Sequence, residues 1–529
     1  MVTAGCRASA PPPPPAEAPE PVVKGGTLVV GAFQEPACAD WLAACGNSSW
    51  GSDMMANQTL PRPFDLVSGD YRPGAVLAGE PTLDPSPPQR VTYRIDPRAV
   101  WSDGQPIDAS DFRYTAEQIK ATTPAATFID SVDDRDPKAA VVTFRQPTAA
   151  WRDSIRFVLP RHVLEGKDRG AEMRDGYRFS GGPWLIDHWT KGQEIKLVPN
   201  PLYWGTKPNL DAVVFKVILD SSAYQAAYKT GQLDMIFVQG AQPETAELRT
   251  LPDTHFEASV GITFEFAMFN TAKPPLDSKA VRQALAYATD RDALVTQASG
   301  ALVPGIKPTQ AFISPSNQAW YTEPFKRYTR DLAKVAQLMT ADGWAKGADG
   351  VWAKSGARAV IELNTATGNH RRELAEQILQ SQWKEAGFAT TVNNAPFSVL
   401  NGEWLGRGTF QAAIYGFAPS TPDPNRCGTF CSRNIPTEAT RFQGNNAGRI
   451  SSPALDEAWG AVEQELDVVK RRELHRRAQD VLADEVPALP ISPVVDVIVY
   501  NATKVGGPVK ASPLGAFGAL NEWYCKGCR

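Results

Sequence analysis

Strand-like and helix-like segments alternate along the chain from Asp277 to Pro493, without a detectable internal repeat. Residues 26–32 are rich in β-formers and bounded by glycine, which predicts a buried strand nearer the N-terminus. A helix is predicted to begin near Asp108, which can cap it while Asp111 occupies its first turn. This alternation predicts an α/β fold. Because 529 residues are too many for one hydrophobic core, we expect two or three domains.

Composition and motifs argue against several classes of function. The formal net charge of −4 gives no broad electrostatic field for nucleic acid or anionic lipid. The sequence contains no run of about 18 apolar residues that could span a bilayer as a helix. It also lacks a Gly-x-Ser-x-Gly elbow, a His-Glu-x-x-His motif and a glycine-rich phosphate loop, and its five histidines are scattered. We therefore expect a protein that is not an enzyme and that has no metal or other cofactor.

The N-terminus contains a candidate lipid-attachment site at Cys6. Residues 3–6, Thr-Ala-Gly-Cys, resemble the end of a bacterial lipoprotein signal, and the proline-rich residues 7–21 predict an extended tether. Thr3 stands where such signals usually have leucine, and their basic and apolar parts are missing, so we expect the native gene to encode an apolar segment upstream. These features predict an extracytoplasmic lipoprotein anchored to the cell membrane. The alternative is a cytosolic protein with a chance Ala-Gly-Cys.

The other six cysteines fall in close sequence pairs, which suits disulfides in an oxidising compartment. Several connectivities are possible, and we prefer the local one. The competing interpretation is a zinc site at the last pair. A structural zinc needs four ligands, however, and neither a His nor a second Cys pair lies nearby in the sequence. The expected disulfides join Cys38 with Cys45, Cys427 with Cys431, and Cys525 with Cys528.

A series of short motifs follows in a fixed order after Lys24. Residues 101–112 read Trp-Ser-Asp-Gly-Gln-Pro-Ile-Asp-Ala-Ser-Asp-Phe, and residues 200–205 read Asn-Pro-Leu-Tyr-Trp-Gly. Together these motifs resemble the family 5 extracellular solute-binding proteins, the group that contains the dipeptide, oligopeptide and nickel binders of ABC importers. We interpret most of them as structural, for example Asp290 and Arg291 as a local ion pair at a helix end. The remaining motifs lie at residues 159–162, 182–189, 231–234, 269–277, 281–291, 341–344 and 478–487.

The resemblance implies a two-lobed fold of the periplasmic-binding-protein type II-like class. Two α/β lobes are joined by two crossing strands, an extra subdomain is inserted in the first lobe, and the ligand is engulfed between the lobes. The expected domains are residues 1–23 as a lipoprotein-like N-terminus and tether, 24–270 as lobe I with the inserted subdomain at about 60–180, 271–499 as lobe II, and 500–529 as a C-terminal return to lobe I.

The same resemblance implies that extended segments of both lobes hold the ligand through main-chain hydrogen bonds. The matching segments are residues 33–35 and 415–421. Trp404, Tyr415 and Phe417 could add stacking surface, or they could belong to the core. The predicted ligand-binding residues are Phe33, Gln34, Glu35, Trp404, Tyr415, Gly416, Phe417, Ala418, Ser420 and Asp423.

Two positions depart from the pattern of the oligopeptide binders. Ser420 stands where they have the aspartate that neutralises the free amino group of the peptide, and Phe417 stands where they have tryptophan. A buried ammonium without a counter-charge costs several kcal/mol, which argues against ordinary peptide recognition. Asp423 or Glu35 could supply the charge instead. Asp423 could equally be a turn residue before Pro424.

The function that the resemblance implies is that of the substrate-binding component of an ABC importer. We expect a monomer that captures a peptide or peptide-like solute and delivers it to permease subunits in the membrane. Two alternatives stay open. The same fold could bind a metal chelate, a siderophore-like compound or a glycan, or it could serve as a cell-envelope sensor without transport.

Overall fold

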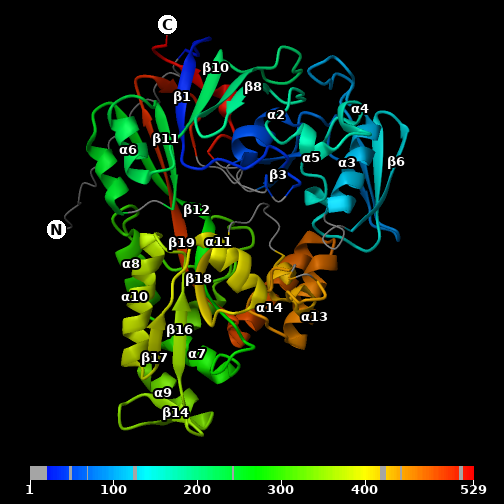
Figure 1. The fold of residues 1–529 in the computed structure, drawn as a ribbon. Coiled ribbons are helices and arrows are strands. Elements are labelled where there is room, and N and C mark those ends of the chain that lie inside the picture. Colours follow the sequence, from blue (N-terminus) through cyan, green and yellow to red (C-terminus); the bar gives the residue numbers. More distant parts are fainter. Residues whose placement is uncertain are drawn as a thin grey trace, which may run out of the picture.

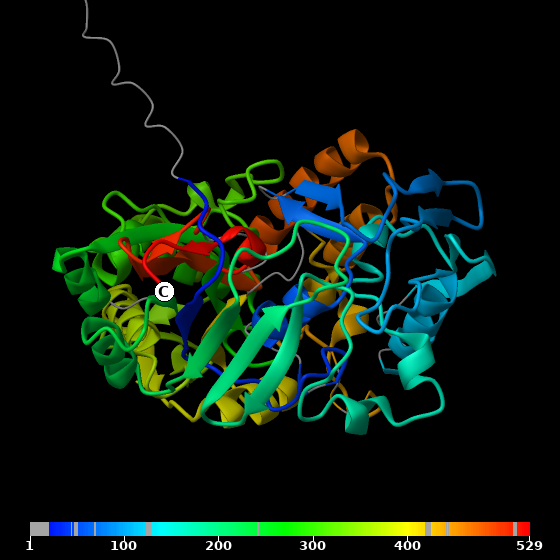
Figure 2. The same cartoon turned by 90° about the horizontal axis from the view of Figure 1, so that it is seen from above.

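The computed structural model of the chain has two lobes, one above the other in Figure 1, with an inserted subdomain beside the upper lobe (Figures 1 and 2). Both lobes mix helices with strands of one large sheet, which confirms the predicted α/β class. No helix in the described part of the chain is long and apolar enough to cross a membrane. The structure describes residues 21–43, 45–46, 51–67, 70–122, 128–240, 243–417, 425–440, 442, 444–510 and 516–528.

A ten-stranded sheet runs through both lobes in the order β17-β16-β18-β12-β19-β11-β1-β10-β9-β8. Its two longest strands, β12 (Thr254–Phe269) and β19 (Ala488–Asn501), pair antiparallel and pass from one lobe to the other (Figure 1). Their register shifts between Val260 and Phe264. Side chains up to Val260 pack in a cluster shared by α6 and β11 of the first lobe and α8 of the second, whereas Phe264 and its successors pack in the lobe II core. The strands therefore cross between the lobes at residues 260–264.

The first lobe is built on the half of the sheet from β11 to β8. Its strand β1 pairs in parallel with β10, and its side chains Leu28 and Val30 are fully buried. The C-terminal residues return to this lobe, where Phe517 and Trp523 join its core. The elements are β1 (Thr27–Ala32), η1 (Ser52–Ala56), α2 (Asn57–Thr59), β8 (Trp184–Thr190), β9 (Glu194–Pro199), β10 (Ala212–Val217), α6 (Ser221–Lys229), β11 (Met235–Gln239), η3 (Pro243–Thr250), β20 (Val505–Gly506), η7 (Leu520–Glu522) and β21 (Tyr524–Cys525).

The inserted subdomain has its own hydrophobic core between α3 and a four-stranded sheet. A capping box starts α3, since Asp108 Oδ1 accepts from Ser110 N at 2.9 Å and Asp111 Oδ2 accepts from Asp108 N at 3.2 Å. Trp101 Nε1 donates to the same Asp111 oxygen at 3.0 Å, so the motif at residues 101–112 is structural. The elements from here to lobe I are β2 (Phe64–Val67), β3 (Asp70–Pro73), β4 (Thr82–Asp84), β5 (Arg90–Arg94), α3 (Ala109–Thr122), β6 (Ile129–Asp136), β7 (Ala139–Phe144), η2 (Trp151–Asp153), α4 (Arg161–Leu164) and α5 (Arg169–Glu172).

The second lobe surrounds the other half of the sheet with helices on both sides of a large apolar core. A small three-stranded sheet, β13-β14-β15, lies at its far end (Figure 1). The elements are α7 (Lys279–Ala288), α8 (Arg291–Ser299), η4 (Pro324–Arg327), α9 (Leu332–Ala341), β13 (Ala345–Lys346), β14 (Trp352–Lys354), β15 (Ala357–Arg358), β16 (Val360–Asn364), α10 (His370–Glu385), β17 (Ala389–Val392), α11 (Phe397–Val399), η5 (Leu400–Leu405), β18 (Ala412–Phe417), α12 (Cys427–Phe430), η6 (Ser432–Asn434), α13 (Pro453–Gln464) and α14 (Val468–Glu485).

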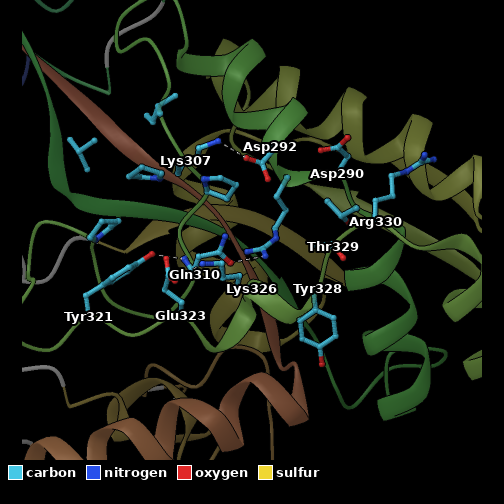
Figure 3. Close-up of a pocket in the computed structure, with 17 residues that line it drawn as sticks. Asp290, Asp292, Lys307, Gln310, Tyr321, Glu323, Lys326, Tyr328, Thr329 and Arg330 are labelled. Atoms are coloured by element: carbon cyan, nitrogen blue, oxygen red, sulfur yellow. Dashed lines mark hydrogen bonds and ion pairs between the residues drawn. The ribbon is translucent and has the colours of Figure 1, made fainter. Parts of the chain in front are cut away.

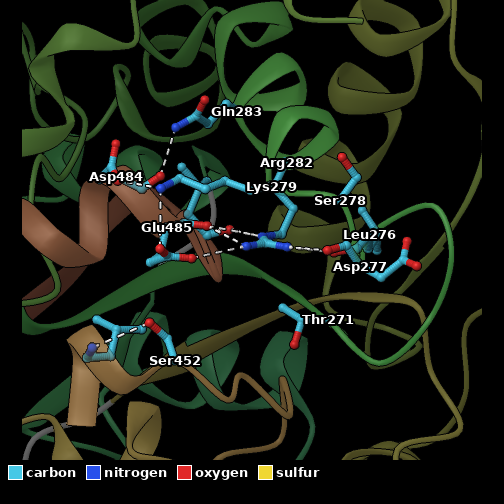
Figure 4. A network of polar contacts seen from close by, with 12 residues as sticks. Thr271, Leu276, Asp277, Ser278, Lys279, Arg282, Gln283, Ser452, Asp484 and Glu485 are labelled. Atoms are coloured by element: carbon cyan, nitrogen blue, oxygen red, sulfur yellow. Dashed lines mark hydrogen bonds and ion pairs between the residues drawn. The ribbon is translucent and has the colours of Figure 1, made fainter. Parts of the chain in front are cut away.

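A buried arginine joins α7 to the end of α14 (Figure 4). Arg282 donates to the carbonyls of Glu485 at 2.8 Å and Val486 at 3.1 Å, and to that of Leu276 at 2.9 Å. Lys279 adds ion pairs to the side chains of Asp484 and Glu485. The last carbonyls of a helix have no partner inside it, so Arg282 supplies donors that α14 otherwise lacks. The motif at residues 281–291 is thus partly explained by helix packing.

The structure corrects our interpretation of Asp290 and Arg291 as an ion pair. Asp290 caps α8 by accepting from Ala293 N at 2.9 Å. Arg291 is 5% exposed and donates instead to the carbonyls of Thr309 at 3.0 Å and Phe325 at 2.8 Å. Tertiary packing brings those carbonyls to the buried guanidinium, which sequence adjacency to Asp290 does not indicate.

The structure joins the cysteines of each close sequence pair. Cys38 and Cys45 hold the loop after β1, Cys427 and Cys431 span α12, and the third disulfide lies at the C-terminus. In that last pair, Cys525 is bonded to Cys528, whose Sγ lies 3.3 Å from the carbonyl oxygen of Thr27. Within the described residues, no group of three or more His, Cys, Asp or Glu side chains could hold a metal ion.

Candidate functional site

The two lobes meet beside the crossing strands, at the N-terminal end of α10. Arg371 of this helix donates from Nη1 to the carbonyl of Gly240, which directly follows β11 of the first lobe. The Gly240 N–H donates to Oδ1 of Asp496 on β19 at 3.4 Å. A second-lobe helix is thereby bonded to the end of a first-lobe strand.

An ion cluster lies at this junction. Arg371 donates to the carboxylate of Glu265 on β12 from Nε at 3.0 Å and from Nη2 at 2.7 Å, which is a two-pronged ion pair. Arg372 donates to the same carboxylate from Nε at 2.6 Å. The side chains of Glu265 and Arg371 are 4% and 6% exposed, whereas that of Arg372 is 15% exposed. Both oxygens of Glu265 therefore have protein donors.

The two carboxyl groups of the junction have opposite pKa shifts. Burial alone would raise the pKa of Glu265, but the charges of Arg371 and Arg372 outweigh burial and hold this pKa at about 2. Burial raises the pKa of Asp496 to about 7, against the smaller effects of the Gly240 hydrogen bond and the charge of Arg371. Glu265 is therefore ionised at neutral pH, and Asp496 is largely neutral in mildly acidic solution.

Gly416 on β18 makes room for Arg372. It is the cross-strand partner of Glu265 in the pairing of β12 with β18. A Cβ atom at Gly416 would lie only 3.1 Å from Nη2 of Arg372, so glycine leaves the space that this guanidinium occupies. Within the described residues, neither terminal amino group of Arg372 has a hydrogen-bond acceptor, because its bond to Glu265 uses Nε.

The strand β18 has an open main-chain edge at its end. One edge pairs with β12 as far as Phe417. On the other edge, β16 reaches only Ala412 and Ala413. Among the described strands, residues 415–417 therefore have no neighbour on that edge. A free main-chain edge of this kind can accept an extended peptide as an added strand.

The aromatic residues predicted for the site are partly built into the second lobe. The ring of Tyr415 packs edge-on against Phe266 at 4.7 Å, and burial raises the pKa of its hydroxyl. Trp404 is partly buried against the same core. Phe417 lies 6.0 Å from Phe264 and 4.4 Å beneath the guanidinium of Arg426, both distances being measured at the ring centroid. Tyr415 therefore contributes its main chain to the edge while its ring stabilises the lobe.

The first-lobe segment directly follows β1. The ring of Phe33 meets that of Tyr224 edge-on at 6.2 Å, and the side chain of Gln34 is exposed. The carboxylate of Glu35 is engaged within its own lobe, where Oε1 accepts from Trp189 Nε1 at 2.6 Å and Oε2 accepts from Gly192 N at 2.9 Å. The carboxylate of Glu35 thus already has donors from its own lobe, and its role in binding an ammonium group stays a prediction. Cys6, Ala418, Ser420 and Asp423 lie outside the described residues.

The lobes also touch far from the crossing strands. The N–H of Ala149, at the base of the inserted subdomain, donates to the carbonyl of Glu463 near the end of α13 at 3.0 Å. Figures 1 and 2 show the orange helices of the second lobe next to the blue and cyan subdomain. The lobes are therefore in contact at both places.

A separate hollow of about 630 Å³ lies in the second lobe against the crossing strands (Figure 3). Val260 and Pro493 contribute to its wall. Four of its charged side chains form two ion pairs, Lys307 with Asp292 at 3.4 Å and Lys326 with Glu323 at 2.9 Å. Because these charges are already balanced, the hollow is a weaker candidate for a specific ligand site than the interlobe junction.

Comparison with known proteins defines the class of this protein. The sequence model of the bacterial extracellular solute-binding proteins, family 5, matches residues 78–430. The chain therefore belongs to this family, whose members are extracytoplasmic binding components of transport systems. The two-lobed fold with its inserted subdomain is that of the family's solved structures.

The names of individual relatives state different solutes. The oligopeptide-binding protein OppA of Mycobacterium bovis is 26% identical over 503 residues, covering 90% of this chain and 82% of the relative. The periplasmic EDTA-binding protein EppA superposes with a TM-score of 0.84 at 21% identity, over 96% of this chain and 97% of that one. The oligopeptide-binding protein AppA of Bacillus subtilis, solved with a nonapeptide, superposes with a TM-score of 0.77 at 19% identity, over 96% and 100%.

Sequence reasoning missed the ion cluster of the junction. A signal was present, because Glu265 interrupts the otherwise apolar strand sequence Phe-Glu-Phe-Ala-Met-Phe at residues 264–269. Such a buried acid needs a cationic partner. The adjacent Arg371 and Arg372 follow Asn369, which caps α10. The pairing still could not be assigned, because more than 100 residues separate the partners.

Proposed function

We propose that this binding component of an ABC importer captures a peptide or peptide-like solute between its two lobes. The observation that carries this proposal is the open edge of β18 at residues 415–417, beside the contact between the lobes. Main-chain hydrogen bonds to such an edge hold an extended ligand without selecting strongly for its side chains. Contacts between the lobes then exclude water from the ligand and favour the closed state when the ligand is present.

The proposal extends to the surroundings of the protein. Cys6 carries the lipid anchor, residues 1–23 form the tether, and the protein works as a monomer that docks on membrane permease subunits. We keep the domain boundaries that the sequence predicts. Residues 24–270 form lobe I, residues 271–499 form lobe II, and residues 500–529 return to lobe I. The protein binds its solute without turning it over.

The direct test is to identify what the purified protein carries and what it binds. Native mass spectrometry of protein from the native host should detect a co-purified small molecule. Calorimetry with peptides of three to nine residues should then give saturable binding to one site per chain, and chromatography of the same mixtures should recover the peptides intact. Failure of every peptide to bind would contradict a peptide ligand, and cleavage of the peptides would contradict the role of a binding protein.

Replacement of Cys6 by Ser tests the proposed anchor. The Cys6→Ser variant, expressed from the complete native gene, should move from the membrane fraction to the soluble extracytoplasmic fraction. A Ser9→Ala variant is a suitable control, because it changes the same segment and keeps Cys6. If Cys6→Ser leaves the distribution unchanged, the chain has no lipid anchor at Cys6.

A further inference from the structure

The start of α14 lies next to the contact between the lobes that is far from the crossing strands. In this contact, the carbonyl of Glu463 accepts from the N–H of Ala149 in the inserted subdomain at 3.0 Å. Only four residues separate Glu463 from Val468, with which α14 begins (Figure 1). A partner that covers the start of this helix is therefore close to the place where the lobes touch. The exposed side chains that form this α14 surface are Val468, Val469, Lys470 and Arg472.

The sequence of the α14 surface is unfavourable for the helix that carries it. Val468 and Val469 are 47% and 77% exposed, although β-branched residues have a low helix propensity. Residues 468–472 read Val-Val-Lys-Arg-Arg and contain no acidic residue. Cations near the N-terminus of a helix oppose its dipole. Helix stability does not explain these residues, and positions that break local rules without a local gain are expected at functional surfaces.

Two cations of the α14 surface are free to bind a partner. Within the described residues, neither Lys470 nor Arg472 has an ion pair. The next two arginines of the helix are neutralised, because both donate to Glu473, at 2.7 Å and 3.0 Å. The guanidinium of Arg472 lies 5.5 Å from the ring centroid of Trp320, which holds this side chain in place. The surface thus presents one fixed and one flexible cation beside two valines.

The subdomain side of the same contact also carries a cation. Arg152 follows Ala149 by three residues, and its guanidinium lies 4.1 Å from the ring centroid of Trp151. Among the described residues, Arg152 has neither a hydrogen-bond acceptor nor a carboxylate partner. A guanidinium that stacks on a ring keeps its N–H groups for an acceptor in its own plane. Cations of both lobes therefore lie within a few residues of one interlobe hydrogen bond.

Two kinds of partner carry the negative charge that this arrangement favours, an anionic membrane and an acidic protein surface. Basic clusters that bind anionic lipid contain about four to eight Lys or Arg residues, whereas the α14 surface has two unpaired cations. A protein interface needs fewer, because a few arginine and apolar anchors supply most of its binding energy. A protein that touches both lobes also binds differently when the lobes are together and when they are apart. These arguments favour a protein.

We propose that the α14 surface and Arg152 dock on an acidic surface of the membrane permease. The proposal rests on the proposed function, because that function makes the permease the partner of this protein. Acidic side chains of the permease pair with Lys470, Arg472 and Arg152, and the two valines pack against apolar groups between them. Because the cations belong to two lobes, the full set of contacts forms only when the lobes touch. The permease thereby distinguishes the closed protein from the open one.

Direct binding to the permease complex tests this proposal. The complex of permease and ATPase subunits is purified from the native host into phosphatidylcholine nanodiscs. The full-length binding protein, purified from the same host with a Cys6→Ser change that removes the proposed lipid, is titrated against it. We expect Arg472→Glu to weaken docking about ten- to a hundred-fold. Arg472→Lys keeps the charge and should restore most of the affinity.

A control and a second variant assign the effect to this surface. Lys384→Glu is the matched control, because Lys384 is also an exposed helix cation of the second lobe without an ion pair among the described residues. It should dock like the wild type. Arg152→Gln should weaken docking as well, which a surface confined to the second lobe does not predict. Unfolding midpoints and calorimetry with a peptide that the wild type binds should be unchanged in Arg472→Glu, because Arg472 lies outside the ligand site.

The outcomes separate this proposal from the proposed function. If the wild type docks and Arg472→Glu docks equally well, the α14 surface is not the docking surface, and the importer function stands. If the wild type binds its solute but docks on no permease complex, both the docking proposal and the importer function are contradicted. If the wild type binds nanodiscs that contain phosphatidylglycerol and lack the complex, and Arg472→Glu does not, the surface is a membrane surface and the permease proposal is overturned.

Discussion

Two of the contacts between the lobes differ in their chemistry. Beside the crossing strands, the contact consists of charged side chains that are almost fully buried, with Arg371 bonded to both Glu265 and Gly240. On the far side, it is the hydrogen bond from the Ala149 N–H to the Glu463 carbonyl. Breaking a buried ion pair by removing one partner is costly, whereas one neutral hydrogen bond contributes about 1 kcal/mol. The far contact is therefore the weaker of these two contacts.

The largest expected effect comes from breaking the charged contact. Glu265→Gln leaves two guanidinium groups without their carboxylate and should lower the free energy of unfolding by about 3–5 kcal/mol. Urea unfolding followed by circular dichroism measures this change. The control is Glu165→Gln on the surface, which removes an exposed partner of Arg161 and should cost less than about 0.5 kcal/mol. Equal stability of the two variants would contradict the structural role of the cluster.

The next effect concerns the second carboxyl group of the junction. Because burial raises the pKa of Asp496 from 3.8 to about 7, its protonated form is favoured in the folded protein. The stability that it contributes is fully present below pH 3.8 and is lost as the pH rises through about 7. Asp496→Asn should therefore remove a pH dependence on the order of 4 kcal/mol between pH 4 and pH 8.

Thermal unfolding of wild type and Asp496→Asn across this range measures the difference. Asp53 is also buried, and burial raises its pKa to about 7, so it adds the same sign of pH dependence to both proteins. Only the difference between the two proteins in how their unfolding temperature changes with pH reports on Asp496. An identical change with pH in both proteins would show that Asp496 has the same pKa in the folded and unfolded chain.

The far contact should be weaker and should affect closure more than folding. Ala149→Pro removes the N–H that donates to Glu463. The loss of this bond should make the closed state less stable and weaken ligand binding by less than about ten-fold. Ala149→Gly keeps the donor and should bind like the wild type. Small-angle scattering of the ligand-bound proteins should detect a larger open fraction in the proline variant only. An unchanged affinity of Ala149→Pro would indicate that this contact does not contribute to closure.

The smallest effect on binding is expected at Glu35. Its carboxylate stabilises the turn between β8 and β9, so Glu35→Gln should cost roughly 1 kcal/mol of stability. It should leave the ratio of affinities for free and N-acetylated peptides unchanged, as calorimetry can determine. A selective loss of the free peptide would instead identify Glu35 as the group that binds the amino terminus.

Much of the fold could be predicted from local patterns. The capping box of α3 could be predicted because Asp108 and Asp111 lie three residues apart. The disulfides could be predicted because the two cysteines of each pair are close in sequence. The assignment of residues 33–35 and 415–417 to the ligand site stays a prediction. The packing of Tyr415 on Phe266 and the bond between Glu35 and Trp189 could not be predicted, because they join residues far apart in the chain.

The sequence by itself determined the α/β class and the family, because each depends on residues close together in the chain. Only the tertiary structure decided the electrostatics of the site. Arg372 meets Glu265 and Gly416 through three different elements, α10, β12 and β18. The charge that faces a ligand depends on which of these groups neutralise one another, and that pairing exists only after distant parts of the chain have packed together.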